Sequence, residues 1–556
     1  MKISGHIVDI LNERIFDGTI VVKGSRIENI VEEAVSLTPA PYILPGFIDS
    51  HIHIESTLLL PENFARLAVR QGTVAVVSDP HEIANVLGVP GVDYMIRNGR
   101  KVRFHFNFGV PSGVPATPFE TAGAKLGPAE VEELLSRDDV YGLAELMNAF
   151  GVVGDDPEVM AKIAAAKKYG KPIDGHAPGF RGDQARKYID AGVSTDHECT
   201  TLAEAEERIK LGMKILIREG SAACDFEELS PLLSRYRDQL MFCTDDKYAD
   251  ELQKGHINKL VGRAVKKGYP LWNILRAACV NPVLHYRLRS GLLRKGDSAD
   301  FILIDNFIDC TVEQTWIEGR KVWDQYDTPC DIERRKTTST AALGKYPNKF
   351  FAQPVAEADI AVPEQTSSDK TTRPIKVLQA SEGSLYTKCL QVRPKTVGGH
   401  IVPDTDRDIL KLVVCNRYAP AQPQVAFING FGLKRGALAS TIAHDSHNII
   451  AVGCSDDEIV RAINCLVQNK GGIAVCDGEK VFDLPLPIAG LMSPLTGEEV
   501  GDRHRKLKSK AKAVGCRFAA PYMTLAFMAL PVIPEIKLTD KGLFDANTFS
   551  FTDLFV

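Results

Sequence analysis

ILPGFIDSHIH, at positions 43–53, joins an apolar run to two histidines that stand two positions apart. Similar short apolar runs follow it, and they alternate with stretches rich in Ala, Glu, Lys and Leu at helical spacing. These runs occupy positions 73–81, 102–112, 140–148, 171–179, 193–198, 214–221 and 240–246. Eight strands that alternate with helices over about 240 residues predict a (β/α)8 TIM barrel, an α/β fold. A doubly wound open sheet would also fit the alternation, but the strand count and the polar strand ends favour the barrel.

Strand-like segments flank the predicted barrel on both sides. Residues 1–42 alternate apolar and polar positions between turn signals, and strand character returns after Pro282 in 291–306 and 310–324. Because neither piece has enough strands for a stable sheet, we expect residues 1–42 and 283–345 to form one small β-rich domain beside a barrel of 43–282. Residues 354–373 are rich in Pro, Ser, Thr and Asp and predict a linker or long surface loop. Residues 346–556 mix strand-like runs with a helical segment and predict a C-terminal α+β domain.

Composition restricts the class of protein. The 556 residues include 66 Lys and Arg against 71 Asp and Glu, a net charge of −5, which predicts no nucleic-acid or anionic membrane partner. No apolar run approaches the roughly 18–20 residues that span a bilayer, and acidic residues near the start argue against a signal peptide. The 12 cysteines are scattered without a C-x-x-C pair, as expected of reduced thiols. We therefore predict a soluble, cytoplasmic, multidomain protein.

Side chains of the kinds that bind metal ions fall at the predicted strand ends. His51 and His53 are two positions apart on one strand, so both imidazoles point to the same face. The carboxyl ends of barrel strands meet at the mouth where such folds keep their active sites. Four of the 13 histidines belong to this one surface, which favours a shared site over isolated buried histidines. We predict two divalent ions bridged by a carboxylate, with the ligands His51, His53, Glu145, His176, His197 and Asp245.

Two of the carboxylates in this set have alternatives. Glu145 could serve as an acid or base instead of a ligand. Asp246 is an immediate alternative to Asp245, although its side chain should point the other way if the strand continues.

Several motifs carry a resemblance to a known family. LPGFIDSHIHIEST (44–57), the TDD of 244–246, ACVNP (278–282) and GLLRKGDSADFILID (291–305) resemble the amidohydrolase superfamily. A narrower resemblance, to the bacterial-type adenine deaminase family, rests on VSDPHEIANVLG, GLAELMN, GHAPG, STDHECT, IREGS, AHDSHNIIAVG and PEIKLTDKGLFD. These motifs cover nearly the whole chain, including the C-terminal domain that most amidohydrolases lack.

The resemblance implies a metal-dependent enzyme that converts adenine and water to hypoxanthine and ammonia for purine salvage. It implies two divalent ions per chain, with Mn2+ or Fe2+ favoured over Zn2+, and a homo-oligomer. A metal-activated hydroxide would attack C6 of adenine, and Asp245 would take its proton and pass it to the departing amine. N1 of the ring must also be protonated. Related deaminases often use a Glu a few residues after the strand-five histidine, but GHAPGFRG (175–182) contains none.

That departure leaves three candidates for the proton shuttle, Glu82, Glu219 and Glu145. For Glu82 and Glu219 an ordinary carboxylate at a helix start is an equally good interpretation. His81, Arg218 and Ser221 are candidates for contacts with the purine. His81 and Asp79 could instead orient the metal ligands, and a structural ion pair is the preferred interpretation of Arg218.

Outside the barrel, AHDSHN (443–448) places His444 and His447 three positions apart. They could form part of a lid over the barrel mouth or bind a further metal, or they could lie in a polar loop with local hydrogen bonds.

Other functions remain open at this point. Cyclic-amide hydrolases of the superfamily often use a modified lysine at strand four, where this chain offers Glu145 and no lysine. The H-x-E and P-C-x-x-C pattern of zinc nucleobase deaminases is absent. A catalytically inactive scaffold would be free to lose members of the predicted ligand set, and this chain retains all of them.

Overall fold

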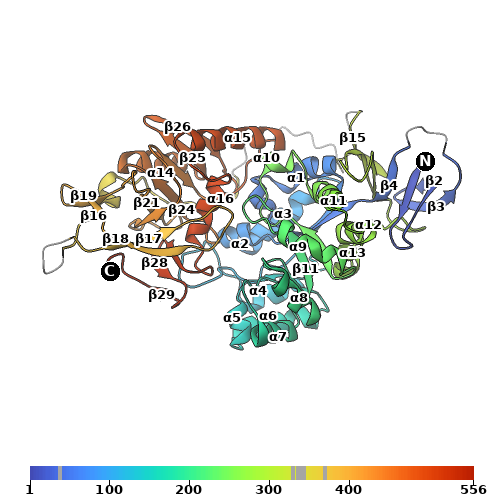
Figure 1. The fold of residues 1–556 in the computed structure, drawn as a ribbon, viewed down its shortest axis with the longest axis horizontal. Coiled ribbons are helices and arrows are strands. Elements are labelled where there is room, and N and C mark those ends of the chain that lie inside the picture. The colour runs from blue at the N-terminus through green and yellow to red at the C-terminus, as the bar shows by residue number, and fades with distance from the viewer. Residues whose placement is uncertain (36–39, 327–331, 334–345, 367–371) are drawn as a thin grey trace.

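The computed structural model describes residues 1–35, 40–326, 332–333, 346–366 and 372–556. The N-terminal sheet lies at one end, the barrel in the middle and the C-terminal domain at the other end (Figure 1). No helix in these described ranges is long and apolar enough to cross a membrane. The cysteines in them are all free thiols, as expected from their scattered spacing.

Eight parallel strands build the TIM barrel, as the sequence predicts. Ile52 and Asp245 form a bridge that joins the last strand region to the first, and Val110 and Leu143 join the third to the fourth. All residues of the first two strands are buried, because both faces of a parallel barrel strand are covered. The strands are β5 (Phe47–Ile52), β6 (Thr73–Ser78), β7 (His105–Phe108), β8 (Leu143–Leu146), β9 (Ile173–Gly175), β10 (Thr195–Asp196), β11 (Lys214–Arg218) and β12 (Leu240–Cys243).

Helices connect the strands and form the outer wall of the barrel (Figure 1). Helix α6 shows a typical start, because Pro157 occupies its first position and the Asp156 carboxylate accepts from the amides of Glu158 and Val159. The helices are α1 (Pro61–Ala68), α2 (His81–Leu87), α3 (Val89–Gly99), α4 (Pro128–Leu135), α5 (Ala149–Val153), α6 (Pro157–Lys168), α7 (Gly182–Asp190), α8 (Leu202–Lys210), α9 (Phe226–Leu229), α10 (Ala249–Leu252), α11 (Ile257–Lys266), α12 (Leu271–Leu275) and α13 (Asn281–Tyr286).

A seven-stranded sheet combines the N-terminal strands with those that follow the barrel. Its order is β15-β14-β13-β4-β1-β2-β3, so strands from both flanks meet at the β13–β4 pair. Phe301 lies opposite Pro45 and Ile304 opposite Tyr42 in that pair. The strands are β1 (Lys2–Asp9), β2 (Arg14–Lys23), β3 (Arg26–Glu32), β4 (Tyr42–Pro45), β13 (Phe301–Ile304), β14 (Val312–Ile317) and β15 (Arg320–Asp324). Residues 36–39, 327–331 and 334–345 of the predicted small domain lie outside the described residues.

An eight-stranded sheet forms the core of the C-terminal domain, in the order β18-β17-β22-β21-β24-β23-β25-β26. The strands are β17 (Ile375–Gln379), β18 (Lys388–Val392), β21 (Leu410–Cys415), β22 (Gln424–Asn429), β23 (Ala437–Ser440), β24 (Ile449–Gly453), β25 (Gly472–Asp477) and β26 (Lys480–Pro485). Helices α14 (Asp456–Asn469), α15 (Gly497–Ala513) and α16 (Pro521–Ala526) accompany it, with the short strands β16 (Val362–Pro363), β19 (Lys395–Val397), β20 (His400–Val402), β27 (Ile536–Thr539), β28 (Gly542–Asp545) and β29 (Ser550–Phe551).

The segment predicted as a linker is only partly irregular. It contains β16, which pairs with β20 further along the chain, and Val362 of β16 packs in a cluster with Ile375 and Ile401. Residues 367–371 of this segment lie outside the described residues.

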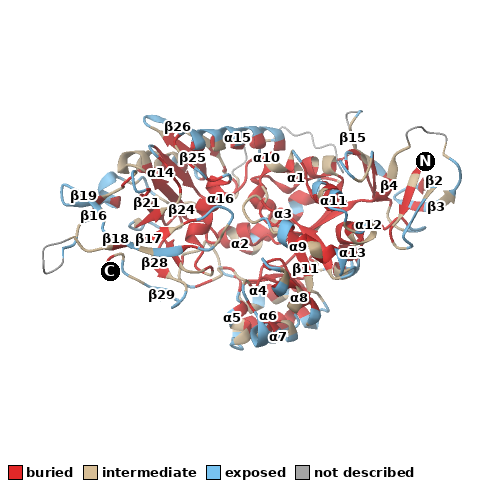
Figure 2. Cartoon of the chain, viewed as in Figure 1, coloured by how far each residue is buried: buried red, intermediate tan, exposed pale blue. Residues whose placement is uncertain are grey.

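The barrel and the C-terminal domain share a packed interface. His504 on α15 is fully buried and its Nδ1 lies 2.8 Å from the Asp250 carboxylate on α10. Leu59, which precedes α1, forms a bridge with Ser493. Buried residues continue from the barrel strands to the central strands of the C-terminal sheet, while helices such as α7 expose their outer faces (Figure 2). The C-terminal domain is therefore positioned to contribute to the barrel mouth.

Candidate active site

Side chains at the carboxyl ends of five barrel strands meet in one buried cluster. His51 lies on β5 and Glu145 on β8, whereas His53, His176, His197 and Asp245 lie one or two residues past β5, β9, β10 and β12. The most exposed members, His176 and Asp245, are each only 7% exposed. The structure thus brings together the complete ligand set predicted from the sequence.

Glu145 stands at the centre of this cluster. Its Oε1 lies 3.4 Å from His53 Nε2 and 3.1 Å from His81 Nδ1. Its Oε2 faces the other imidazoles, at 3.0 Å from His176 Nδ1 and 3.3 Å from His197 Nε2. One carboxylate therefore has each oxygen directed at a different pair of imidazoles, the arrangement expected of a bridging ligand.

Asp245 and the two histidines of the first strand form a second group. Asp245 Oδ1 lies 3.2 Å from His53 Nε2 and 3.4 Å from His51 Nε2. The Nδ1 of His53 donates to the Asp79 carbonyl at 3.0 Å, which leaves Nε2 as the ring's free lone pair. The hydrogen bond to Asp79 therefore fixes the His53 tautomer in which Nε2 can bind a metal ion.

Several polar atoms of the cluster are suited to divalent ions. The Nε2 atoms of His51 and His176 are buried without a hydrogen-bond partner among the described residues. Ligand atoms within 4.8 Å of one another occur in the sets His51–His53–Asp245, His51–Glu145–His197 and His176–His197–Glu198. Unpaired buried imidazole nitrogens beside carboxylates are costly without a cation, so the donor set fits metal ions.

The carboxylates of the cluster are held in the charged form. Burial alone would raise the pKa of Glu145, but hydrogen bonds from His176 and His197 bring this pKa well below its ordinary value. For Asp245 the same effect of burial is outweighed by the positive charge of His197 and by the close imidazoles of His51 and His53, which together lower its pKa. Both carboxylates are therefore negatively charged and can bind a cation.

The C-terminal domain contacts the edge of this cluster at Glu82, a residue of the barrel. Glu82 is the second residue of α2 in the barrel. Its Oε1 lies 3.0 Å from His444 Nδ1, and its Oε2 contacts His447 Nε2. His81 Nε2 lies 3.6 Å from Glu82 and 3.9 Å from Asp445. The lid interpretation of AHDSHN agrees with this placement, since the loop between β23 and β24 lies against the barrel mouth.

A small cavity of about 30 Å3 lies above the cluster and is closed by both domains. The barrel contributes Met147 beside the polar residues, and the C-terminal domain contributes apolar side chains. Phe527 stacks on the His444 ring with a centroid distance of 4.7 Å. The apolar residues from the C-terminal domain are Leu385, Met523, Phe527 and Leu530, which we call the lid residues.

Three residues that the sequence analysis offered for proton transfer or purine contacts are instead engaged with other side chains. The Glu219 carboxylate pairs with Arg263 and does not line the cavity, because it leaves the strand on the outer side. The Ser221 hydroxyl donates to Glu251 at 2.6 Å, so it is committed away from the cavity. Arg218 is 2% exposed and donates to Glu198 at 2.6 Å and to Asp245 at 3.1 Å, the structural ion pairing that was the preferred interpretation.

Two further carboxylates line the site: Glu198, which the sequence analysis did not single out, and Asp246, which was expected to point away. Glu198 follows His197 directly, lines the cavity and lies 3.5 Å from His176 Nδ1. Burial would raise the pKa of Glu198, but Arg218 and His176 lower it well below its ordinary value. Asp246 also lines the cavity instead of pointing away, because β12 ends at Cys243 and Asp245 has a φ of 56°. The adjacent acid in STDHECT was the only available signal for Glu198.

Comparisons with known proteins agree over the whole chain. The amidohydrolase family model matches residues 42–322, and the adenine deaminase C-terminal domain model matches residues 384–550. An adenine deaminase of Salinibacter ruber is 50% identical over 558 residues, covering 100% of this chain and 99% of the relative. An adenine deaminase of Methanosarcina mazei is 48% identical over 562 residues with the same coverage. Among solved structures, an N-acetyl-D-glucosamine-6-phosphate deacetylase of Mycobacterium smegmatis is 17% identical, with a TM-score of 0.44 over 58% of this chain and 100% of that chain.

Proposed function

This chain belongs to the adenine deaminase family within the amidohydrolases and catalyses the deamination of adenine, and we propose that side chains at the barrel mouth hold two divalent metal ions for that reaction. The observation that carries the proposal is the Glu145 carboxylate, whose two oxygens face different imidazole pairs. The ligands of the proposal are His51, His53, Glu145, His176, His197 and Asp245. When bound, the ions supply Lewis-acid activation of water, lowering its pKa towards about 7. Mn2+ or Fe2+ is our proposal for the metal.

Asp245 is the proposed base for the attack at C6. Its carboxylate is ionised and lies between the first-strand imidazoles and Arg218. It accepts the proton of the attacking water and delivers it to the departing amine, so the leaving group departs as ammonia. Arg218 positions this carboxylate, since its guanidinium holds both Asp245 and Glu198.

Glu82 is the proposed proton shuttle to N1 of adenine. It lines the cavity, whereas Glu219 is paired with Arg263 outside it. Burial would lower the pKa of His444, but the adjacent Glu82 carboxylate raises it to about 9. The protonated His444 imidazole can therefore supply, through Glu82, the proton that is delivered to N1. Glu145 is occupied by four imidazoles and serves as the bridging ligand in this proposal.

The lid residues are proposed to contact the faces of the purine. A purine is flat and apolar on both faces, which suits Phe527 and Met523 on one side and Met147 on the barrel side. Since the cavity measures only about 30 Å3, the lid must move to admit adenine. The C-terminal domain thus gains a role in substrate binding that the barrel alone does not supply.

The test is ammonia release from adenine by the purified chain reloaded with Mn2+, beside a metal-stripped control. We expect hypoxanthine only from the loaded chain, with two metal ions bound per chain. Two bound metals with no turnover of adenine would contradict the substrate, and turnover by the stripped chain would contradict the metal centre. A role in purine salvage, a cytoplasmic location and a homo-oligomer remain predictions from the sequence.

A further inference from the structure

A second and much larger cavity lies at the other end of the barrel, away from the catalytic cluster. Its volume is about 1200 Å3, and it shares no lining residue with the cavity above the metal ligands. Residues of the barrel and of the seven-stranded sheet both line it, with Asn107 from β7 and Arg26 from β3 among them. None of the groups proposed for adenine deamination reaches this cavity.

The cavity exists because β7 and β8 separate towards their amino ends. The two strands are joined where Tyr141 donates to Phe108, Val110 to Gly142 and Ala144 to Val110. In the described structure the first residues of β7, His105 to Asn107, pair only with β6 on their other side. These residues are half-buried, whereas every residue of β5 and β6 is buried. A polar stretch of the barrel wall therefore faces the opening.

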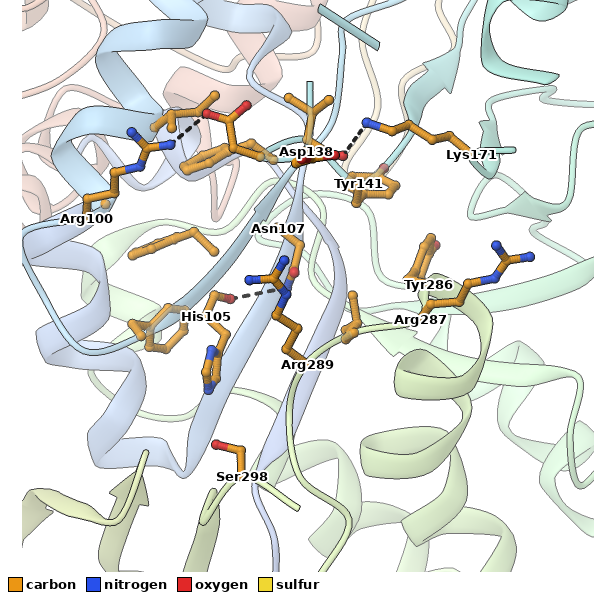
Figure 3. A pocket seen from close by; sticks show the side chains of 18 of the residues that line it. Arg100, His105, Asn107, Asp138, Tyr141, Lys171, Tyr286, Arg287, Arg289 and Ser298 are labelled. Atoms are coloured by element: carbon orange, nitrogen blue, oxygen red, sulfur yellow. Dashed lines mark hydrogen bonds and ion pairs between the residues drawn. The ribbon is translucent and has the colours of Figure 1, made fainter. Parts of the chain in front are cut away.

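Positive charge gathers around this opening in a chain whose net charge is −5. Figure 3 shows Arg289 extending towards Asn107 in the middle of the cavity, with Arg100 and Lys171 above it in that view. Arg26, Arg100, Lys171, Arg287 and Arg289 line the cavity against three acids, Asp138, Asp139 and Glu318. Like charges gathered in a concave surface repel one another unless an anion joins them, and they attract anions from solution.

Of these five cations, only Arg100 forms an ion pair within hydrogen-bonding distance among the described residues. Arg100 pairs with Asp139 at 2.7 Å, which Arg137 also binds. Arg26 donates to the Gly296 carbonyl, and Lys171 to the carbonyls of Arg137 and Val140. Among the described residues, the exposed guanidinium groups of Arg287 and Arg289 form no ion pair.

The inner wall is aromatic and fixed in place. The hydroxyls of Tyr141 and Tyr286 both donate to the buried Asp174 carboxylate, the latter at 3.0 Å. Their rings lie edge to face with a centroid distance of 5.3 Å. Tyr286 is only 4% exposed, so it is the half-buried ring of Tyr141 that offers the cavity an aromatic edge near the arginines, which suits a ligand that joins an apolar or flat group to a charged oxyanion.

We propose that this cavity binds a small phosphate-bearing molecule of nucleotide size, with the phosphate at Arg289, whose side chain extends into the middle of the cavity, and with Arg287 contributing positive charge beside Tyr286 (Figure 3). Guanidinium groups bind phosphate oxygens in paired hydrogen bonds, and the volume exceeds what inorganic phosphate alone requires. The site is separate from the proposed adenine site, so its occupancy does not depend on the assignment of the reaction.

Calorimetric titration of the metal-loaded full chain with AMP tests the proposal, with inorganic phosphate and adenosine as partial probes. We expect saturable AMP binding with a Kd between about 1 μM and 1 mM, weaker binding of phosphate, and loss of binding for uncharged adenosine. Arg287→Ala with Arg289→Ala should weaken AMP binding at least tenfold and leave adenine turnover unchanged. Arg393→Ala, at an exposed arginine of the C-terminal domain outside the cavity lining, is the matched control and should bind AMP normally.

Three results would overturn the proposal. Absence of saturable AMP binding at millimolar concentration would show that the cations do not form a site. Binding that survives in the double arginine variant would place the anion elsewhere, for example at the catalytic metals. Adenosine binding as tightly as AMP would show that the phosphate is not recognised.

Discussion

His444 Nδ1, from the C-terminal domain, lies 3.0 Å from Oε1 of Glu82, at the start of a barrel helix. The contact joins two domains at the edge of the catalytic cavity, and Glu82 is 2% exposed. The deamination site is therefore completed by residues that stand more than 350 positions apart in the chain, and its carboxylates can be tested separately.

Glu82→Gln should lower kcat by about 10²- to 10⁴-fold, because the amide cannot transfer a proton to N1. Steady-state kinetics with adenine measures the loss. Glu219→Gln is the matched control, since its carboxylate pairs with Arg263 outside the cavity, and kcat should change less than about threefold. A larger loss in the Glu219 variant than in the Glu82 variant would reverse the assignment of the shuttle.

His51→Ala and His176→Ala should each reduce turnover by more than about 100-fold and lower the bound metal, because each removes a proposed ligand. Metal analysis beside the adenine assay provides both readouts, and far-UV circular dichroism monitors the fold. The exposed His400, on β20, supplies the control variant His400→Ala. Full activity in either ligand variant would contradict the metal assignment.

Asp245→Asn should retain part of the metal and lose about 10²- to 10⁴-fold in kcat, because an amide oxygen can still bind a cation but cannot accept the proton. Metal content and kcat are measured on the same preparation of the variant, and the two losses are compared. If the loss of activity simply followed the loss of metal, Asp245 would be a ligand without a role in proton transfer.

Phe527→Ala should raise the KM for adenine about tenfold with a smaller effect on kcat, because it removes an aromatic face from the lid. Phe351, which is 58% exposed, provides a control substitution of the same kind in the C-terminal part of the chain. An unchanged KM in the Phe527 variant would remove this ring from the substrate site.

Lys537→Met should change how stability depends on pH. Burial lowers the pKa of Lys537 to about 7, and its Nζ donates to the carbonyls of Leu385 and Phe527. An unfolded lysine titrates near about 10.4, so between pH 7 and 10 the unfolded chain binds the extra proton and the folded chain does not. The native chain should therefore gain stability over the variant as pH rises through this window, by at most about 1.4 kcal/mol per pH unit.

Denaturant unfolding of both proteins from pH 6 to 10 measures this difference. Below pH 7 both states of Lys537 are protonated, so the difference should be constant there. The exposed Lys395 gives the control variant Lys395→Met, which should run parallel to the native chain. If the free energy of unfolding of Lys537→Met followed the same pH dependence as that of the native chain, the buried amine would have an ordinary pKa.

Local sequence pattern predicted the barrel and its histidines because both depend on short-range signals. Side chains alternate between the two faces of a strand, so His51 and His53 point to the same side. In a TIM barrel the carboxyl ends of all the strands lie at the same end of the barrel. Side-chain partners from distant segments carry no such signal. The pairing of Glu219 with Arg263 and of Ser221 with Glu251 depends on helices packed outside the barrel.

The direction of Asp246 was unpredictable for a related reason. The expectation that its side chain points away from the cavity assumed that β12 continues through Asp246. The positive φ of Asp245 instead ends the alternation of side chains before that residue. The lid residues Leu385 and Phe527 reach the site only through the fold of the C-terminal domain, where no local pattern separates them from core residues.

The β13–β4 pair of the seven-stranded sheet has a consequence for how the chain is made. β4 is complete by position 45, but its partner edge, β13, begins at position 301. At about 5–20 residues per second, a ribosome needs roughly 13 to 50 s to synthesise the intervening chain. During that interval the nascent N-terminal strands present an open hydrogen-bonding edge with apolar side chains, which is a template for wrong pairing in crowded polysomes. The edge of β4 is therefore covered only after residues 301–304 have been synthesised and have paired with it.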